Sequence, residues 1–87
     1  MISAEISLYP LTPDYETLIV DFIYLLRDQP SITVAVNGLS TQLTGDYLAV
    51  MSAITRAMGP TLAGKVTCSF VIKVLNVDVS PGTEVEV

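Results

Sequence analysis

The chain has 87 residues, of which 51% are hydrophobic and 15% charged, and nine acidic against four basic side chains give a net charge of −5. This length allows one domain with a single hydrophobic core. The acidic balance argues against nucleic-acid binding, which needs basic groups to neutralise phosphates. With no histidine and a single cysteine, Cys68, the chain cannot form an intrachain disulfide or a cysteine metal cluster. We expect no bound metal and no cofactor.

Apolar runs along the chain stay well short of the roughly 20 residues that a membrane-spanning helix needs. The first residues have the pattern of a strand rather than that of a basic and then apolar leader. We therefore expect a cytoplasmic protein with no membrane partner.

Residues 1–10 predict a strand with two different faces, because apolar and polar side chains alternate there. The apolar face consists of Ile2, Ala4, Ile6 and Leu8, and the polar face of Ser3, Glu5, Ser7 and Tyr9. An ordinary exposed face would be rich in Lys, Glu and Arg, whereas this one carries small hydroxyls, one aromatic ring and one carboxylate. Such a composition indicates a surface that is covered by a ligand or by another subunit.

Two segments predict amphipathic helices. The first covers about residues 13–28, with Thr12 as N-cap, Pro13 at the first helical position and Pro30 stopping the helix. The second begins after Gly45-Asp46 and is expected to end at Gly59-Pro60. Its predicted buried stripe consists of Tyr47, Val50, Met51, Ile54, Ala57 and Met58.

Residues 32–43 predict a β-hairpin. Asn37-Gly38 lies between two alternating segments and is a strong signal for a type I′ turn, because both central residues of that turn need positive φ. A two-residue loop pairs Val36 with Leu39, Val34 with Thr41 and Ile32 with Leu43. These side chains then share one face, and Thr33, Ala35, Ser40 and Gln42 share the other.

Residues 65–74 alternate again and predict a fourth strand. The tail after it, residues 77–87, contains Pro81-Gly82 and a Glu-Val alternation, which fits either a frayed end or an extra strand that pairs with a neighbour. We expect one domain over residues 1–76, followed by this tail.

The predicted element order is βαββαβ. Right-handed crossovers convert this order into a ferredoxin-like α+β sandwich, with an antiparallel four-stranded sheet in the order 4-1-3-2 and both helices on one face. The first and third strands are then central neighbours. Their residues on the face without helices converge, with Glu5, Ser7 and Tyr9 opposite Ser40, Gln42 and Thr44.

Glu5 is the sharpest candidate for ligand binding, because a carboxylate on a covered sheet face needs a partner. It is expected to accept hydrogen bonds from an aminopyrimidine, to pair with Lys73 or Lys65, or simply to meet solvent. Tyr9 either stacks on a heteroaromatic ring or packs at the edge of the core or in an interface. The sequence holds no nucleophile with an adjacent base and no glycine-rich phosphate loop, so binding is favoured over catalysis.

The segments Ile2-Ser-Ala-Glu-Ile-Ser-Leu-Tyr-Pro-Leu11 and Leu39-Ser-Thr-Gln-Leu-Thr-Gly-Asp46 flank the first predicted helix. They resemble the two signatures of the thiamine/hydroxymethylpyrimidine-binding (YkoF-like) family. The resemblance implies a ferredoxin-like, non-enzymatic protein that binds thiamine or hydroxymethylpyrimidine and forms homo-oligomers, dimers or tetramers, through its sheets. Carried over residue by residue, it implies that the ligand-binding residues are Glu5, Ser7, Tyr9, Ser40 and Thr41.

Two other classes of function stay open, because this fold hosts many functions and decides none of them. One is a structural or regulatory homo-oligomeric domain without a small ligand. The other is a small ferredoxin-like enzyme such as an acylphosphatase, which would want an arginine in the first loop, where residues 10–14 have none.

Overall fold

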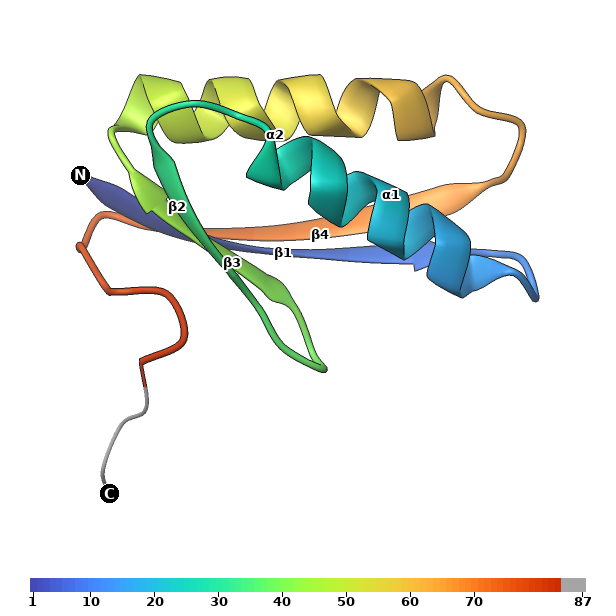
Figure 1. The fold of residues 1–87 in the computed structure, drawn as a ribbon, viewed down its shortest axis with the longest axis horizontal. Coiled ribbons are helices and arrows are strands. Elements are labelled where there is room, and N and C mark those ends of the chain that lie inside the picture. Colours follow the sequence, from blue (N-terminus) through green and yellow to red (C-terminus); the bar gives the residue numbers. More distant parts are fainter. Residues whose placement is uncertain (84–87) are drawn as a thin grey trace.

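A computed structural model describes residues 1–83 and contains regular elements in the order βαββαβ there (Figure 1). The elements are β1 (Ile2–Pro10), α1 (Tyr15–Arg27), β2 (Ile32–Val36), β3 (Thr41–Gly45), α2 (Tyr47–Leu62) and β4 (Cys68–Leu75).

The strands form one antiparallel sheet in the order β2-β3-β1-β4, which confirms the predicted ferredoxin-like topology. β1 pairs with β3 on one side and with β4 on the other. Both helices lie on the same face of the sheet (Figure 1), and we call the opposite face the open face. With 13 and 16 residues, neither helix within residues 1–83 is long and apolar enough to cross a membrane.

The hydrophobic core lies between the helices and the sheet face that they cover. Ala4, Ile6 and Leu8 of β1 are buried in it, as their alternation predicted. Leu26 of α1 and Val50 of α2 belong to the same cluster and are completely buried. Each large aliphatic side chain buried in this way stabilises the fold by about 1.5–3 kcal/mol.

The hairpin between β2 and β3 differs from the prediction. Val36 pairs with Thr41, so the loop spans residues 37–40 and the predicted two-residue turn is wrong. Asn37 Oδ1 accepts hydrogen bonds from the N–H groups of Leu39 (3.0 Å) and Ser40 (3.2 Å), and these bonds stabilise the wider loop. Neither residue of the Asn-Gly dipeptide has positive φ. Because the pairing is shifted by an even number of residues, every side chain keeps its predicted face.

The ends of three elements also differ from the prediction. α1 begins at Tyr15, with Asp14 rather than Thr12 at the N-cap. α2 continues through Gly59 and Pro60 to residue 62, although a proline inside a helix removes one N–H donor and crowds the preceding turn. The backbone N–H of Ala63 still donates to the Gly59 carbonyl (3.0 Å), which extends the last turn. β4 spans residues 68–75 instead of 65–74.

Residues 76–83, which we call the C-terminal segment, leave β4 and lie over the open face near the start of β1 (Figure 1). Ser3 Oγ donates a hydrogen bond to the Val77 carbonyl (2.7 Å) and accepts one from the Val79 N–H (2.7 Å). These residues form neither a helix nor a strand. The Glu-Val alternation that suggested an extra strand falls on residues 84–87, outside the described residues.

Two side chains of β3 hold the same segment. Thr44 Oγ1 lies 3.1 Å from Asp78 Oδ1, and Gln42 Oε1 accepts a hydrogen bond from the Gly82 N–H (2.7 Å). Part of the hydroxyl-rich open face is therefore covered by the chain itself, where a ligand or another subunit was expected.

Candidate functional site

A difference in length between β1 and β3 opens a gap at one end of the sheet. β1 has nine residues and β3 has five, and their pairing ends where Ile6 lies opposite Thr41. Residues 7–10 of β1 therefore extend past β3 and pair with β4 alone. Within residues 1–83, no backbone hydrogen bond joins them to the hairpin loop. The other main-chain edge of this part of β1 is left without a strand partner.

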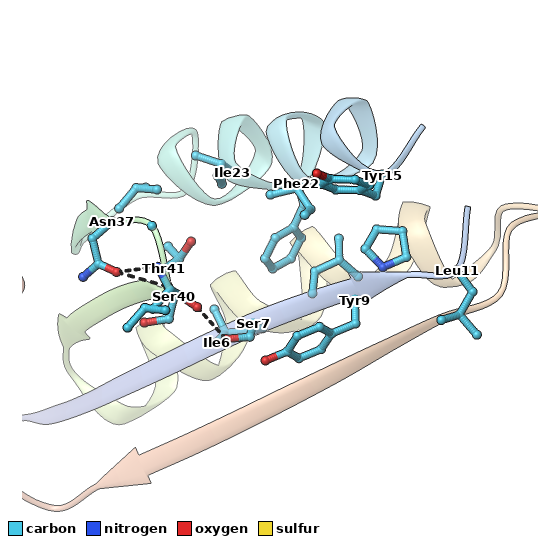
Figure 2. A pocket seen from close by; sticks show the side chains of 16 residues that line it. Ile6, Ser7, Tyr9, Leu11, Tyr15, Phe22, Ile23, Asn37, Ser40 and Thr41 are labelled. Carbon is cyan, nitrogen blue, oxygen red and sulfur yellow. Dashed lines mark hydrogen bonds between the residues drawn. The ribbon is translucent and has the colours of Figure 1, made fainter. Parts of the chain in front are cut away.

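A cavity of about 440 Å³, the main cavity, lies in this gap between the end of β1, α1 and the hairpin loop (Figure 2). Its volume is that of a typical small-ligand pocket, about 300–1,000 Å³. Most of its lining is aliphatic or aromatic: Ile6, Leu8, Tyr9, Leu11, Tyr15, Ile19, Phe22, Ile23, Val36 and Leu39. Its polar side chains are Ser7, Asn37, Ser40 and Thr41.

Aromatic rings reach the main cavity from two elements. Phe22 of α1 is buried, and its ring centroid lies 5.0 Å from that of Phe70 on β4, which holds the inner wall in place. Tyr9 at the end of β1 and Tyr15 in the first turn of α1 are about half exposed. Their rings leave aromatic surface uncovered, on which a flat ligand could stack.

Both serines of the main cavity donate their hydroxyl protons within the protein. Ser7 Oγ donates to the Leu39 carbonyl (3.3 Å), and Ser40 Oγ donates to Glu5 Oε2 (2.9 Å). The lone pairs of both oxygens remain available to accept hydrogen bonds. A hydroxyl that donates to a carboxylate is also polarised, which makes the Ser40 oxygen a better acceptor. The main cavity therefore suits a ligand that carries N–H groups.

Thr41 brings a polar group into a buried part of the main cavity. The residue is only 5% exposed and lies on the helix-covered face of β3. Its hydroxyl makes no hydrogen bond to another residue of the described chain, yet no buried side-chain oxygen there is sealed off without a partner. The Thr41 hydroxyl is therefore accessible from the main cavity and free to pair with a ligand.

Glu5 lies outside the main cavity, on the open face. Besides its bond to Ser40, its Oε1 lies 3.8 Å from Lys73 Nζ, so one of its predicted pairings with a lysine is present. It lines a smaller cavity of about 150 Å³ beneath the C-terminal segment, together with Lys73 and Pro81. Of the five predicted ligand-binding residues, Glu5 alone reaches the main cavity only through another side chain.

Tyr15, Asn37 and Leu39 line the main cavity but were not among the predicted site residues, because the site was expected on the open face. Tyr15 could have been recognised, because it is an aromatic residue that precedes the apolar stripe of α1. Its side chain stays exposed in the first turn of that helix. Asn37 and Leu39 were hidden by the predicted two-residue turn. In the four-residue loop both lie beside the end of β1.

Several solved structures share this fold. The chain aligns with a domain of unknown function, DUF77, from Bacillus cereus at 18% identity and a TM-score of 0.71, covering 99% of this chain and 82% of that one. It aligns with a hypothetical protein from Methanocaldococcus jannascii at 24% identity and a TM-score of 0.66, covering 83% and 77%.

A third structure, a "putative thiamine biosynthesis/salvage protein" from Thermotoga maritima, aligns at 15% identity and a TM-score of 0.65, covering 82% of this chain and 80% of that one. The chain matches no protein-family model and no curated protein. At these identities the likeness establishes a shared fold, and the chemistry of the site has to come from its own residues.

Proposed function

We propose that this protein binds thiamine or its hydroxymethylpyrimidine moiety in the main cavity and catalyses no reaction on it. The observation that carries the proposal is the lining of that cavity: exposed tyrosine rings beside serine oxygens that accept hydrogen bonds and a free threonine hydroxyl. These groups complement a flat, amino-substituted heterocycle.

The aminopyrimidine ring offers a π-face for Tyr9 or Tyr15 and an exocyclic amino group for the oxygens of Ser7 and Ser40. Its hydroxymethyl group can pair with the Thr41 hydroxyl. The ring nitrogen beside the amino group accepts a hydrogen bond, and the amino group donates one. This adjacent acceptor and donor match the N–H and C=O groups along the unpaired edge of β1. The name of the Thermotoga maritima structure agrees with this ligand class.

Binding without catalysis is proposed because of what lines the main cavity. Its 16 lining residues include no acidic or basic side chain and no cysteine. General acid–base and nucleophilic catalysis both need such groups within hydrogen-bonding reach of the substrate.

We also propose that the protein is a homo-oligomer, a dimer or tetramer, as the family resemblance implies. β4 is an edge strand on which neither helix packs extensively. Its side chains Val71, Val74 and Leu75 stay 58%, 46% and 46% exposed. An exposed apolar strand edge favours pairing with another chain.

The ligand proposal is tested by isothermal titration calorimetry with thiamine, hydroxymethylpyrimidine and the thiazole alcohol in separate experiments. We expect heat from the first two and none from the third. Thr41→Val, which removes the free hydroxyl and keeps the shape, should weaken binding about threefold to tenfold.

The matched control is Thr55→Val, because Thr55 lies on α2 outside the main cavity and bonds only to its own helix. This variant should bind like the unmodified chain. If none of the three compounds gives heat or a thermal shift at millimolar concentration, the binding proposal is wrong and a structural role remains.

A further inference from the structure

Three features of the main cavity bear on the charge of its ligand. The first is the absence of basic side chains from its lining: Arg27, Arg56, Lys65 and Lys73, the four basic residues of the chain, all lie elsewhere. A phosphate group carries about −1.5 to −2 charges near neutral pH, and proteins usually bind it with Arg or Lys. The main cavity offers no such partner.

The second feature is the state of the hairpin loop. Backbone N–H groups in loops can form an anion-binding concavity without any basic side chain. Here the N–H groups of Leu39 and Ser40 both donate to Asn37 Oδ1, at 3.0 and 3.2 Å. The Asn37 N–H donates to the Ser40 carbonyl (3.1 Å). These three donors of the loop are thus occupied within the protein.

The third feature is the beginning of α1 beside Tyr15. The N-terminus of a helix attracts anions through its free N–H groups and dipole. In this protein Asp14 occupies the N-cap and Glu16 the first turn. Their carboxylates already supply the negative charge that this helix end favours, and they repel a second anion. The net charge of −5 adds to that repulsion.

From these features, and resting on the proposed function, we propose that the main cavity selects the uncharged heteroaromatic alcohol and rejects its phosphate ester. The protein would then hold the free hydroxymethylpyrimidine and release it on phosphorylation. The reaction that consumes its ligand would be a phosphoryl transfer from a nucleoside triphosphate on a separate enzyme: the hydroxyl oxygen forms the new P–O bond, the bond to the terminal phosphate of the donor breaks, and the diphosphate and the hydroxyl proton leave.

The test compares hydroxymethylpyrimidine with hydroxymethylpyrimidine phosphate by calorimetry on the full chain. We expect the ester to bind at least about tenfold more weakly. In Leu39→Lys, a cation at a lining position that is 91% exposed should raise the affinity for the ester, relative to that for the alcohol, about threefold to tenfold.

The matched control is Leu48→Lys, which adds the same charge on an exposed leucine in the first turn of α2, outside the main cavity. An equal gain in both lysine variants would overturn the local explanation, because overall charge alone would then account for the effect. Equal binding of alcohol and ester would overturn this inference and leave the proposed function intact. If neither compound binds, this inference fails, and the proposed function fails with it when thiamine does not bind either.

Discussion

Glu5 contacts the main cavity through Ser40 and is held on its other side by Lys73. Its 42% exposed side chain makes the ion pair with Lys73 weak, because solvent screens the two charges. The bond from Ser40 matters more, since it fixes the serine proton and leaves the oxygen lone pairs toward a ligand. Glu5 is therefore a positioning residue in the proposed site.

Glu5→Gln should weaken the binding of hydroxymethylpyrimidine about threefold to tenfold, because a neutral amide polarises the Ser40 hydroxyl less than a carboxylate does. Calorimetry gives the affinity. Ser40→Ala should reduce the binding affinity less in the Glu5→Gln variant than in the unmodified chain, since Glu5 acts through Ser40. Fully additive losses would contradict this role. Glu16→Gln, which removes an exposed carboxylate from α1, is the control.

Two glycines of the chain meet very different surroundings. A Cβ added at Gly45, where β3 ends, would lie 3.0 Å from the Ser31 carbonyl oxygen and 3.3 and 3.4 Å from Ile32 and Val50. A Cβ added at Gly59 of α2 meets nothing within 4 Å. Only the first position needs the close approach that glycine permits.

Gly45→Ala should lower the free energy of unfolding by about 1–3 kcal/mol, because the Ser31 backbone and two neighbouring side chains must move. Gly59→Ala should change it by less than about 1 kcal/mol, because the higher helix propensity of alanine is opposed by crowding of its Cβ against the ring of Pro60, the next residue. Urea unfolding followed by circular dichroism measures both. Equal effects in the two variants would contradict the crowding at Gly45.

At the scale of elements, the sheet order and the face of each strand could be predicted, because they follow from the alternation of side chains and the handedness of crossovers. The loop at residues 37–40 could not, since its length depends on two hydrogen bonds to the Asn37 side chain. The same loop decides the place of the site. The gap beside two strands of unequal length can be located only when their pairing register is known.

The path of the C-terminal segment was equally hidden from the sequence. Its hydrogen bonds to Ser3 and Gln42 join residues about 80 and 40 positions apart, which no local pattern encodes. The hydroxyl-rich face was recognised as a covered surface, but the covering chain could not be identified. The four predicted residues that line the main cavity were carried over from the two segments of the family resemblance, and two of them lie on the polar face of the first strand.

For the whole molecule, the outer edge of β4 is the surface through which we propose that copies of the chain assemble. Both of its faces are involved, because Ile72 and Val74 lie on the helix-covered side and Val71 and Leu75 on the open face. Each of these side chains is at least 38% exposed. A strand with apolar groups on both faces and no outer partner within residues 1–83 is suited to join the sheet of a second copy.

We expect sedimentation velocity at micromolar concentration to give a dimer or tetramer. Val71→Lys should shift the protein toward monomer, because a charge would then lie at the contact. Val20→Lys places the same charge on an equally accessible position of α1 and should leave the mass unchanged. A monomer in the unmodified chain would rule out the homo-oligomer.

The two ends of the sheet differ in how firmly their strands are joined, because the C-terminal segment lies at one of them. At one end it joins β1 to β3 through hydrogen bonds with Ser3, Thr44 and Gln42. At the other end, residues 7–10 of β1 pair with β4 alone. Within residues 1–83, the hairpin loop is joined to β1 by two side-chain hydrogen bonds, from Ser7 to the Leu39 carbonyl and from Ser40 to Glu5. We therefore expect local opening of the sheet to be most frequent at the end that holds the main cavity. Hydrogen exchange of the β1 amides should become faster from Ser3 toward Tyr9. We expect the hairpin loop to move more readily than the strand ends that the C-terminal segment holds.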